Sequence, residues 1–294
     1  MLELEQKIIS PIVGSNWIDV LSGNIQNYVQ KLFKGSDTGR KAKDWLNGIW
    51  LAHPLHPAVT DVPVGAWTTA MVLDGIGSVS GRDVRGETSA AIGVGLGCAA
   101  LAAASGLADW ADLPGEQRRI GIIHALTNTL AAGLFAASLW RRLAGNRSGA
   151  RALSTGGFLA VMVGAYLGGN LTYRLGTQVN RNAWKAETRQ FVPVMREEEL
   201  PADQLKRVDV QGLPVAIVRR GGRIYAMGEI CSHMGGPLSK GRLEDDQVVC
   251  PWHGSTYRLE DGSVVHGPSP YRQVHYEVRV RQGQIELCAE PTIG

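Results

Sequence analysis

The 294-residue chain has little cysteine and little net charge. Its formal charge is +3, from 30 basic and 27 acidic residues, so it offers no electrostatic basis for a nucleic-acid partner. Its four cysteines are too few and too scattered for a secreted disulfide scaffold. The N-terminus lacks a basic start and a long apolar run. We therefore expect no signal peptide, and any membrane insertion must come from internal spans.

Long apolar runs are absent from the last third of the chain and frequent before it. Three uncharged stretches are long enough to cross a bilayer, which needs about 20 residues. A fourth, earlier stretch is weaker because Asp61 and Asp74 within it would have to face a bundle interior or a partner. In chain order the stretches are residues 57–79, 89–108, 120–140 and 152–173. We predict an α-helical membrane bundle of four transmembrane helices. Buried core helices of a soluble protein are the alternative.

The region before these stretches has an amphipathic pattern. Residues 14–33 carry apolar side chains every three or four positions, which predicts a helix that lies on the membrane surface or packs on the protein. Lys and Arg residues near the span ends count nine on one side and six on the other, which favours both termini in the cytoplasm. We expect a multi-pass protein of the cell's inner, cytoplasmic membrane. Asp61 and Asp74 also leave a transporter-like bundle open.

From residue 191 onward the pattern changes to short strand-like runs. Glycine-containing turns separate runs of alternating apolar and polar residues, as in a small all-β domain. We therefore predict a multidomain fold, a helical membrane bundle plus an all-β domain. The segments are an N-terminal amphipathic or interfacial segment at residues 1–50, the four-helix domain at 51–175, a linker at 176–190 and the β domain at 191–294.

The most specific motif lies inside the β domain. Cys231-Ser-His233 is followed by Cys250-Pro-Trp-His253, so two Cys/His pairs stand on loops between strand-like runs. Two thiolates and two imidazoles are the set needed when two histidines replace two cysteines on one iron of a 2Fe-2S cluster. A four-ligand zinc site is the competing interpretation, because short Cys and His spacings also bind zinc.

The last hundred or so residues resemble a Rieske domain. The matching residues are Cys231-x-His233-x-Gly235, Pro237-Leu238, Gly241, Cys250-Pro-Trp-His-Gly-Ser255, Asp261-Gly262 and Gly267-Pro268. The resemblance implies that Cys231 and Cys250 hold the inner iron of the cluster. It also implies that His233 and His253 hold the outer iron near solvent, where an electron partner would dock.

Departures from the family pattern add detail. Rieske proteins of quinol-oxidising cytochrome bc complexes carry a disulfide pair where this chain has Gly236 and Trp252, so the domain is more similar to the ferredoxins that feed ring-hydroxylating oxygenases. Ser255 and Tyr257 match the hydroxyl pair that hydrogen-bonds to sulfur in high-potential members. Such donors stabilise the reduced cluster, so we expect a potential above that of the ordinary ferredoxin type, within roughly −150 to +300 mV. The alternative is that both hydroxyls only cap a loop.

A second group of histidines precedes the bundle or lies within it. His53-Pro-Leu-His56-Pro resembles the opening signature of a bacterial four-helix membrane family of unknown function, a resemblance that covers residues 48–175. His124 is the only other histidine before the β domain. With alternating spans, all three share one membrane face. They could ligate haem or another metal, or carry protons beside a quinone. A purely structural role is the alternative.

Together these features predict a membrane-anchored Rieske protein that passes single electrons between a donor and an acceptor. The expected partners are a redox protein or a quinone, with the lipid bilayer around the bundle. Nothing in the chain supplies the mononuclear iron site of a Rieske oxygenase, so we expect an electron-transfer component of an oxidoreductase system with no oxygenase catalytic domain in this chain. The alternative is a redox-sensing protein whose cluster state controls a partner.

Overall fold

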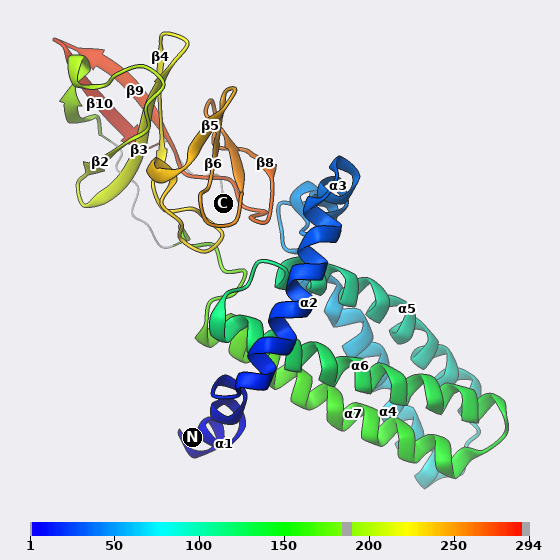
Figure 1. The fold of residues 1–294 in the computed structure, drawn as a ribbon. Helices are drawn as coiled ribbons and strands as arrows, with labels where there is room; N and C mark the ends of the chain where they lie inside the picture. Colours follow the sequence, from blue (N-terminus) through cyan, green and yellow to red (C-terminus); the bar gives the residue numbers. More distant parts are fainter. Residues whose placement is uncertain (1, 184–189, 290–294) are drawn as a thin grey trace. The chain divides into compact units, whose positions relative to one another are not determined.

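The computed structural model describes residues 2–183 and 190–289. They fall into two compact units (Figure 1). The helical unit comprises Met1–Gly39 and Leu55–Thr177, and the β unit comprises Arg40–Pro54 and Gln178–Gly294. Six residues of the predicted linker, 184–189, lie outside the described residues.

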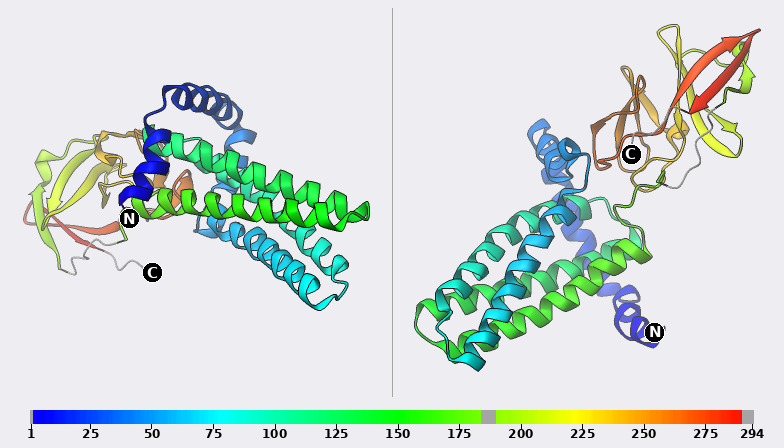
Figure 2. Two further views of the ribbon diagram at one scale, coloured as in Figure 1. Left: turned by 90° about the horizontal axis from the view of Figure 1, so that it is seen from below. Right: turned by 180° about the vertical axis from the view of Figure 1, so that it is seen from behind.

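The helical unit contains the predicted four-helix bundle. Helices α4 and α5 pack as one hairpin, and α6 and α7 pack as a second (Figure 2). Three helical segments, α5, α6 and Gly149–Arg174, are long and apolar enough to cross a membrane. The 26-residue α4, which carries Asp61 and Asp74, is the fourth helix of the bundle. The helices are α1 (Leu2–Val13), α2 (Asn16–Lys34), α4 (Leu55–Ser80), α5 (Arg85–Trp110), α6 (Gly115–Leu143) and α7 (Arg147–Gly169), followed by a π-helical turn at Asn170–Arg174.

Helix α2 is amphipathic, as predicted, and uses one face for packing. Ile18 and Val29 are buried in a cluster with Trp110 at the end of α5. The Gln26 side chain donates to the carbonyl oxygens of Trp110 and Leu113 at 3.1 and 2.8 Å. The helix also keeps large apolar side chains exposed, namely Trp17, Val20, Leu21, Tyr28 and Leu32. Its other face therefore remains available to a membrane surface.

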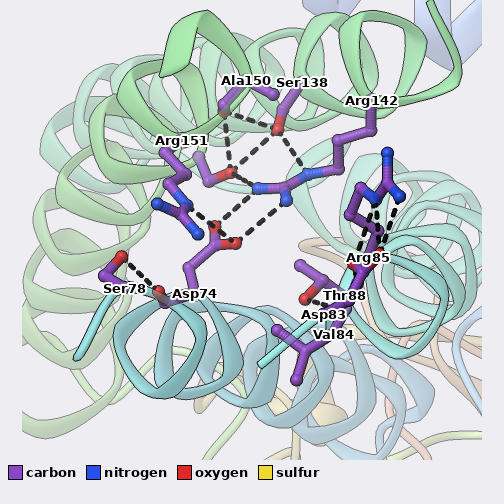
Figure 3. Close-up of polar contacts among 11 residues, drawn as sticks. Asp74, Ser78, Asp83, Val84, Arg85, Thr88, Ser138, Arg142, Ala150 and Arg151 are labelled. Carbon is purple, nitrogen blue, oxygen red and sulfur yellow. Dashed lines mark hydrogen bonds and ion pairs between the residues drawn. The ribbon is translucent and has the colours of Figure 1, made fainter. Parts of the chain in front are cut away.

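A buried ion pair joins α4 to α6. The Arg142 guanidinium donates to the Asp74 carboxylate at 2.9 and 2.5 Å, and Ser138 and Ser154 lie against the same guanidinium (Figure 3). Asp74 thus faces the bundle interior, the placement that a charged group in a span requires. Asp61 is exposed.

The β unit consists of two antiparallel sheets. The larger has the strand order β1-β10-β9-β4-β3-β2 and the smaller has the order β5-β6-β7-β8. The strand-like runs of the sequence lie in strands, which confirms the predicted all-β domain. These runs are residues 214–218, 223–227, 247–249, 276–280 and 284–287. The strands are β1 (Val192–Arg196), β2 (Lys206–Val210), β3 (Leu213–Arg220), β4 (Arg223–Gly228), β5 (Arg242–Glu244), β6 (Gln247–Val249), β7 (Thr256–Arg258), β8 (Val264–His266), β9 (His275–Arg281) and β10 (Gln284–Ala289).

A short helical segment from early in the chain also belongs to the β unit. It includes the end of α3 (Asp37–Leu46) and a 3-10 turn at Ile49–Leu51. The Asp44 carboxylate accepts hydrogen bonds from His266 Nδ1 at 2.8 Å and from the backbone N–H of Gly267 at 2.9 Å. Both bonds tie this early segment to the end of β8.

Candidate metal centre

Two loops of the same construction carry the predicted ligands. In each, the cysteine N–H donates to the carbonyl five residues later, Gly236 in the first loop and Ser255 in the second, at 2.9 and 2.8 Å. Gly235 and Gly254, each four residues after its cysteine, donate back to the cysteine carbonyl. Both glycines have positive φ, 85° and 82°, which L residues rarely adopt. The glycine of each motif is therefore required by the turn that presents the cysteine.

These loops bring the two thiols together in the core between the sheets. Hydrogen bonds from the Cys250 thiol and the Tyr257 hydroxyl lower the pKa of the Cys231 thiol to about 7. The pKa of the Cys250 thiol is raised by its hydrogen bond with Cys231 and by its burial. Cysteine binds metal as the thiolate, so the two adjacent sulfurs are placed to serve as ligands. The surrounding core contains Ala216, Val218, Met227, Leu238, Val248, Tyr257 and Leu259.

The imidazoles of the two loops lie beside each other. The ring centroids of His233 and His253 are 5.1 Å apart, and the rings are nearly perpendicular. His233 is 2% exposed, unlike the solvent-near position that the resemblance implies, whereas His253 is half-buried beside the 56% exposed Trp252. A Cβ at Gly236 would lie 2.7 Å from Cys250 Sγ, so only glycine leaves this sulfur its space. Two thiols and two imidazoles thus converge, the donor set that suits a 2Fe-2S cluster.

The predicted hydroxyl pair lies next to the Cys231 sulfur. The Tyr257 hydroxyl is 3.1 Å from Cys231 Sγ and 2.9 Å from Ser232 Oγ, and burial raises the pKa of Tyr257 well above its usual value. It therefore keeps its proton and can donate to sulfur. The Ser255 hydroxyl also hydrogen-bonds to Cys231 and accepts from the backbone N–H of Ser269 at 3.1 Å.

We expect Tyr257→Phe to lower the midpoint potential of the cluster by roughly 40 to 90 mV. Removing a hydrogen bond to sulfur of about 1 to 2 kcal/mol destabilises the reduced state, and about 59 mV corresponds to a tenfold change for one electron. The measurement is a redox titration followed by EPR. Tyr225→Phe in β4 is the matched control and should leave the potential unchanged. An unmoved midpoint in Tyr257→Phe would restrict this hydroxyl to holding the loop.

Two buried amide side chains, not anticipated from the sequence, support the first loop. Gln273 is fully buried, and its Nε2 donates to the carbonyl oxygens of Gly228 and Ile230 at 2.5 and 2.6 Å. Asn182 donates to Gln273 Oε1 and to Ile230 O, both at 3.0 Å. These bonds hold the backbone immediately before Cys231. No motif marks either residue, since each partner lies more than forty positions away.

The structure brings together two of the three predicted histidines near the bundle. The ring centroids of His56 and His124 are 6.2 Å apart. Their Nδ1 atoms donate to the carbonyl oxygens of Ala102 and Gly164 at 2.8 and 2.9 Å. His53 belongs to the β unit, where its side chain is exposed and its Nδ1 lies 2.9 Å from the carbonyl oxygen of Pro54.

Comparison with known proteins agrees with this division. The family described as "Rieske [2Fe-2S] domain" matches residues 190–282, and the family described as "Predicted membrane protein (DUF2231)" matches residues 52–181. The first match contains both Cys/His loops, and the second contains the complete four-helix bundle.

Individual relatives match the β unit. The chain is 33% identical over 88 residues to the 3-phenylpropionate/cinnamic acid dioxygenase ferredoxin subunit of Escherichia coli (strain K12), covering 30% of this chain and 82% of that protein. It is 28% identical over 96 residues to apoptosis-inducing factor 3 of Mus musculus, covering 33% of this chain but only 16% of that protein. A ferredoxin-length chain in a solved complex of reduced oxygenase and oxidized ferredoxin in carbazole 1,9a-dioxygenase matches at 26% identity and a TM-score of 0.34. The match covers 36% of this chain and 99% of that chain.

The paired Cys/His loops, the hydroxyls beside sulfur, the four-helix bundle, the two family matches and the ferredoxin subunit of Escherichia coli lead to one description. The chain joins a DUF2231 membrane-protein domain to a C-terminal Rieske [2Fe-2S] domain of the ferredoxin type.

Proposed function

We propose that this protein is a membrane-anchored electron carrier whose 2Fe-2S cluster passes single electrons between a donor and an acceptor. The observation that carries the proposal is the pair of equivalent loops that present Cys231, His233, Cys250 and His253 around a shared thiol pair. The relationship to ferredoxin subunits of dioxygenases supports an electron-transfer role. The cluster would supply one-electron redox chemistry when bound, and Tyr257 and Ser255 would stabilise its reduced state.

The partner is proposed to dock at the surface beside His253. Trp252, which is 56% exposed, lies next to this histidine with ring centroids 6.3 Å apart. An exposed aromatic side chain beside a cluster ligand offers a desolvated contact with a partner, and Trp is enriched where protein surfaces meet. The partner is a redox protein, with a membrane quinone as the other acceptor class.

The bundle is proposed to anchor the carrier in the cell's inner membrane, with the Rieske domain in the cytoplasm. The apolar segments α5, α6 and Gly149–Arg174 support insertion, and the excess of Lys and Arg on one side supports the orientation. Protease treatment of spheroplasts tests this topology. Protection of the Rieske domain until the membrane is permeabilised supports the orientation, and its digestion in intact spheroplasts contradicts it.

EPR of the full chain in detergent tests the electron-carrier proposal. We expect a Rieske-type signal after dithionite reduction, one-electron redox titration behaviour, and rapid reoxidation by an added one-electron acceptor. Cys231→Ala and Cys250→Ala should abolish the signal because each removes an iron ligand. Cys288→Ala makes the same change in β10 of the same domain and should retain it. Iron-replete wild-type protein without a cluster, or with zinc in its place, would contradict the proposal.

A further inference from the structure

The two hairpins of the bundle are structural repeats. In three successive layers, a side chain of α4 meets one of α6, and the partners are always 68 residues apart. Because the layers follow in the same order on both helices, α4 and α6 run in the same direction and the hairpins are related by an approximate two-fold axis along the bundle. The layers are His56 with His124, Trp67 stacked on Phe135 at 4.5 Å, and Asp74 paired with Arg142.

The second helices, α5 and α7, repeat the pattern that surrounds these layers. In each of these helices, a backbone carbonyl accepts a hydrogen bond from the histidine of the same hairpin. A glycine follows four residues after the residue with that carbonyl. A Cβ on that glycine would lie 2.9 Å from the His56 ring on α5 and 3.1 Å from the His124 ring on α7. In every matched pair, the two residues are the same number of positions apart in the sequence. The pairs are Gly95 and Gly157, Ala102 and Gly164, and Gly106 and Gly168.

The two histidines present the same nitrogen. A carbonyl oxygen only accepts, so Nδ1 of each neutral imidazole is the donor and Nε2 carries the lone pair. A hydrogen bond from one ring nitrogen to a carbonyl is the arrangement that orients histidine ligands in metal sites. The Asn128 amide nitrogen lies 3.3 Å from His124 Nδ1 and 3.4 Å from Nε2, and it donates to the His124 carbonyl at 2.8 Å.

We propose that His56 and His124 are the two axial ligands of an iron tetrapyrrole held on the two-fold axis of the bundle. Two imidazole nitrogens on opposite sides of one metal ion, each about 2 Å away, place their ring centroids about 6 Å apart. The observed separation is 6.2 Å, whereas the Rieske pair, which shares one iron from adjacent positions, is at 5.1 Å. The site is separate from the cluster, so it stands whether or not the electron-carrier proposal does.

The donor set favours a tetrapyrrole over a bare metal ion. Among the described residues of the helical unit, no group of three or more His, Cys, Asp or Glu side chains is placed to hold an ion. Two imidazoles would leave a bare ion short of ligands, whereas a tetrapyrrole supplies four equatorial nitrogens and needs only two axial ones. Sites at the interface of internal repeats are also a recurrent arrangement in membrane bundles.

The test uses the full chain from cells supplied with a haem precursor, purified in detergent. We expect about one haem per chain with the absorbance of six-coordinate, low-spin iron, as two axial imidazoles require. His56→Ala and His124→Ala should each abolish this low-spin spectrum, and His53→Ala should preserve it. The Rieske EPR signal of the same samples reports folding and shows separately whether the cluster is present.

A second pair of variants leaves both ligands in place. Gly106→Ala puts a methyl group 2.9 Å from the His56 ring, whereas Gly97→Ala on the same helix meets nothing within 4 Å. Titration with added haemin should show roughly tenfold weaker binding in Gly106→Ala only, since displaced orienting contacts cost about that much affinity. Wild-type protein that neither contains haem nor binds haemin would overturn the proposal. So would a low-spin spectrum that survives both histidine variants, or a bare metal ion or quinone bound in place of haem.

Discussion

Asp74→Ala is expected to destabilise the helical unit by about 3 to 5 kcal/mol, the usual cost of removing one partner of a buried ion pair. The Arg142 side chain is 4% exposed, so the variant leaves a buried guanidinium (Figure 3). Its remaining hydrogen-bond partners among the described residues are the hydroxyls of Ser138 and Ser154. Arg151, whose Nε is 3.9 Å from the carboxylate, is 36% exposed and can turn to solvent or lipid headgroups. The measurement is unfolding of the full chain in mixed detergent micelles, followed by near-UV circular dichroism.

A neighbouring ion pair provides the control. Asp83 and Arg85 pair at 2.7 Å, but both side chains are 52% exposed, so Asp83→Ala should reduce the stability far less than Asp74→Ala does. The double variant Asp74→Leu with Arg142→Leu should recover much of the loss, because it leaves no buried charge unpaired. If Asp74→Ala is as stable as Asp83→Ala, the Asp74–Arg142 pair does not stabilise the bundle. Asp74 would then again be a candidate for proton or ion transport.

Gln273→Leu is expected to destabilise the Rieske domain by about 3 kcal/mol and to hasten loss of its cluster. The variant removes the two bonds that Gln273 Nε2 donates to buried carbonyls and the bond that its Oε1 accepts from Asn182, and each lost bond costs about 1 kcal/mol. Because the carbonyls of Gly228 and Ile230 precede Cys231, the ligand loop should loosen as well. Thermal unfolding of the full chain, with the bleaching rate of the cluster absorbance, measures both effects.

Gln204→Leu makes the same substitution at an exposed position of the domain and should change neither quantity. Equal stability of the two variants would contradict the supporting role of Gln273. A destabilised Gln273→Leu with an unchanged bleaching rate would confine that role to the fold and remove it from the cluster site.

The elements predicted from sequence are those that depend on neighbouring residues. Hydrophobic runs predicted the bundle helices. Alternating apolar and polar residues between glycine-containing turns predicted strands such as β3 and β9. The two Cys/His motifs were readable because each lies in a loop of six residues that closes on itself through hydrogen bonds. The two acids within α4 conflicted with a span. The partner Arg142 resolves the conflict for Asp74, whereas Asp61 is exposed instead of facing the bundle interior.

The sequence by itself therefore determined the two domain types, the 2Fe-2S donor set and the hydroxyls beside sulfur. Only the tertiary structure decided which distant groups meet: Gln273 with the Cys231 loop, Asp74 with Arg142, and, of the three histidines expected at one membrane face, His56 with His124. The reason is physical. Loop closure and helix formation depend on contacts between residues a few positions apart, whereas these pairings depend on how whole elements pack. The repeat that relates the two hairpins of the bundle is not visible in the sequence, because their sequences have low similarity.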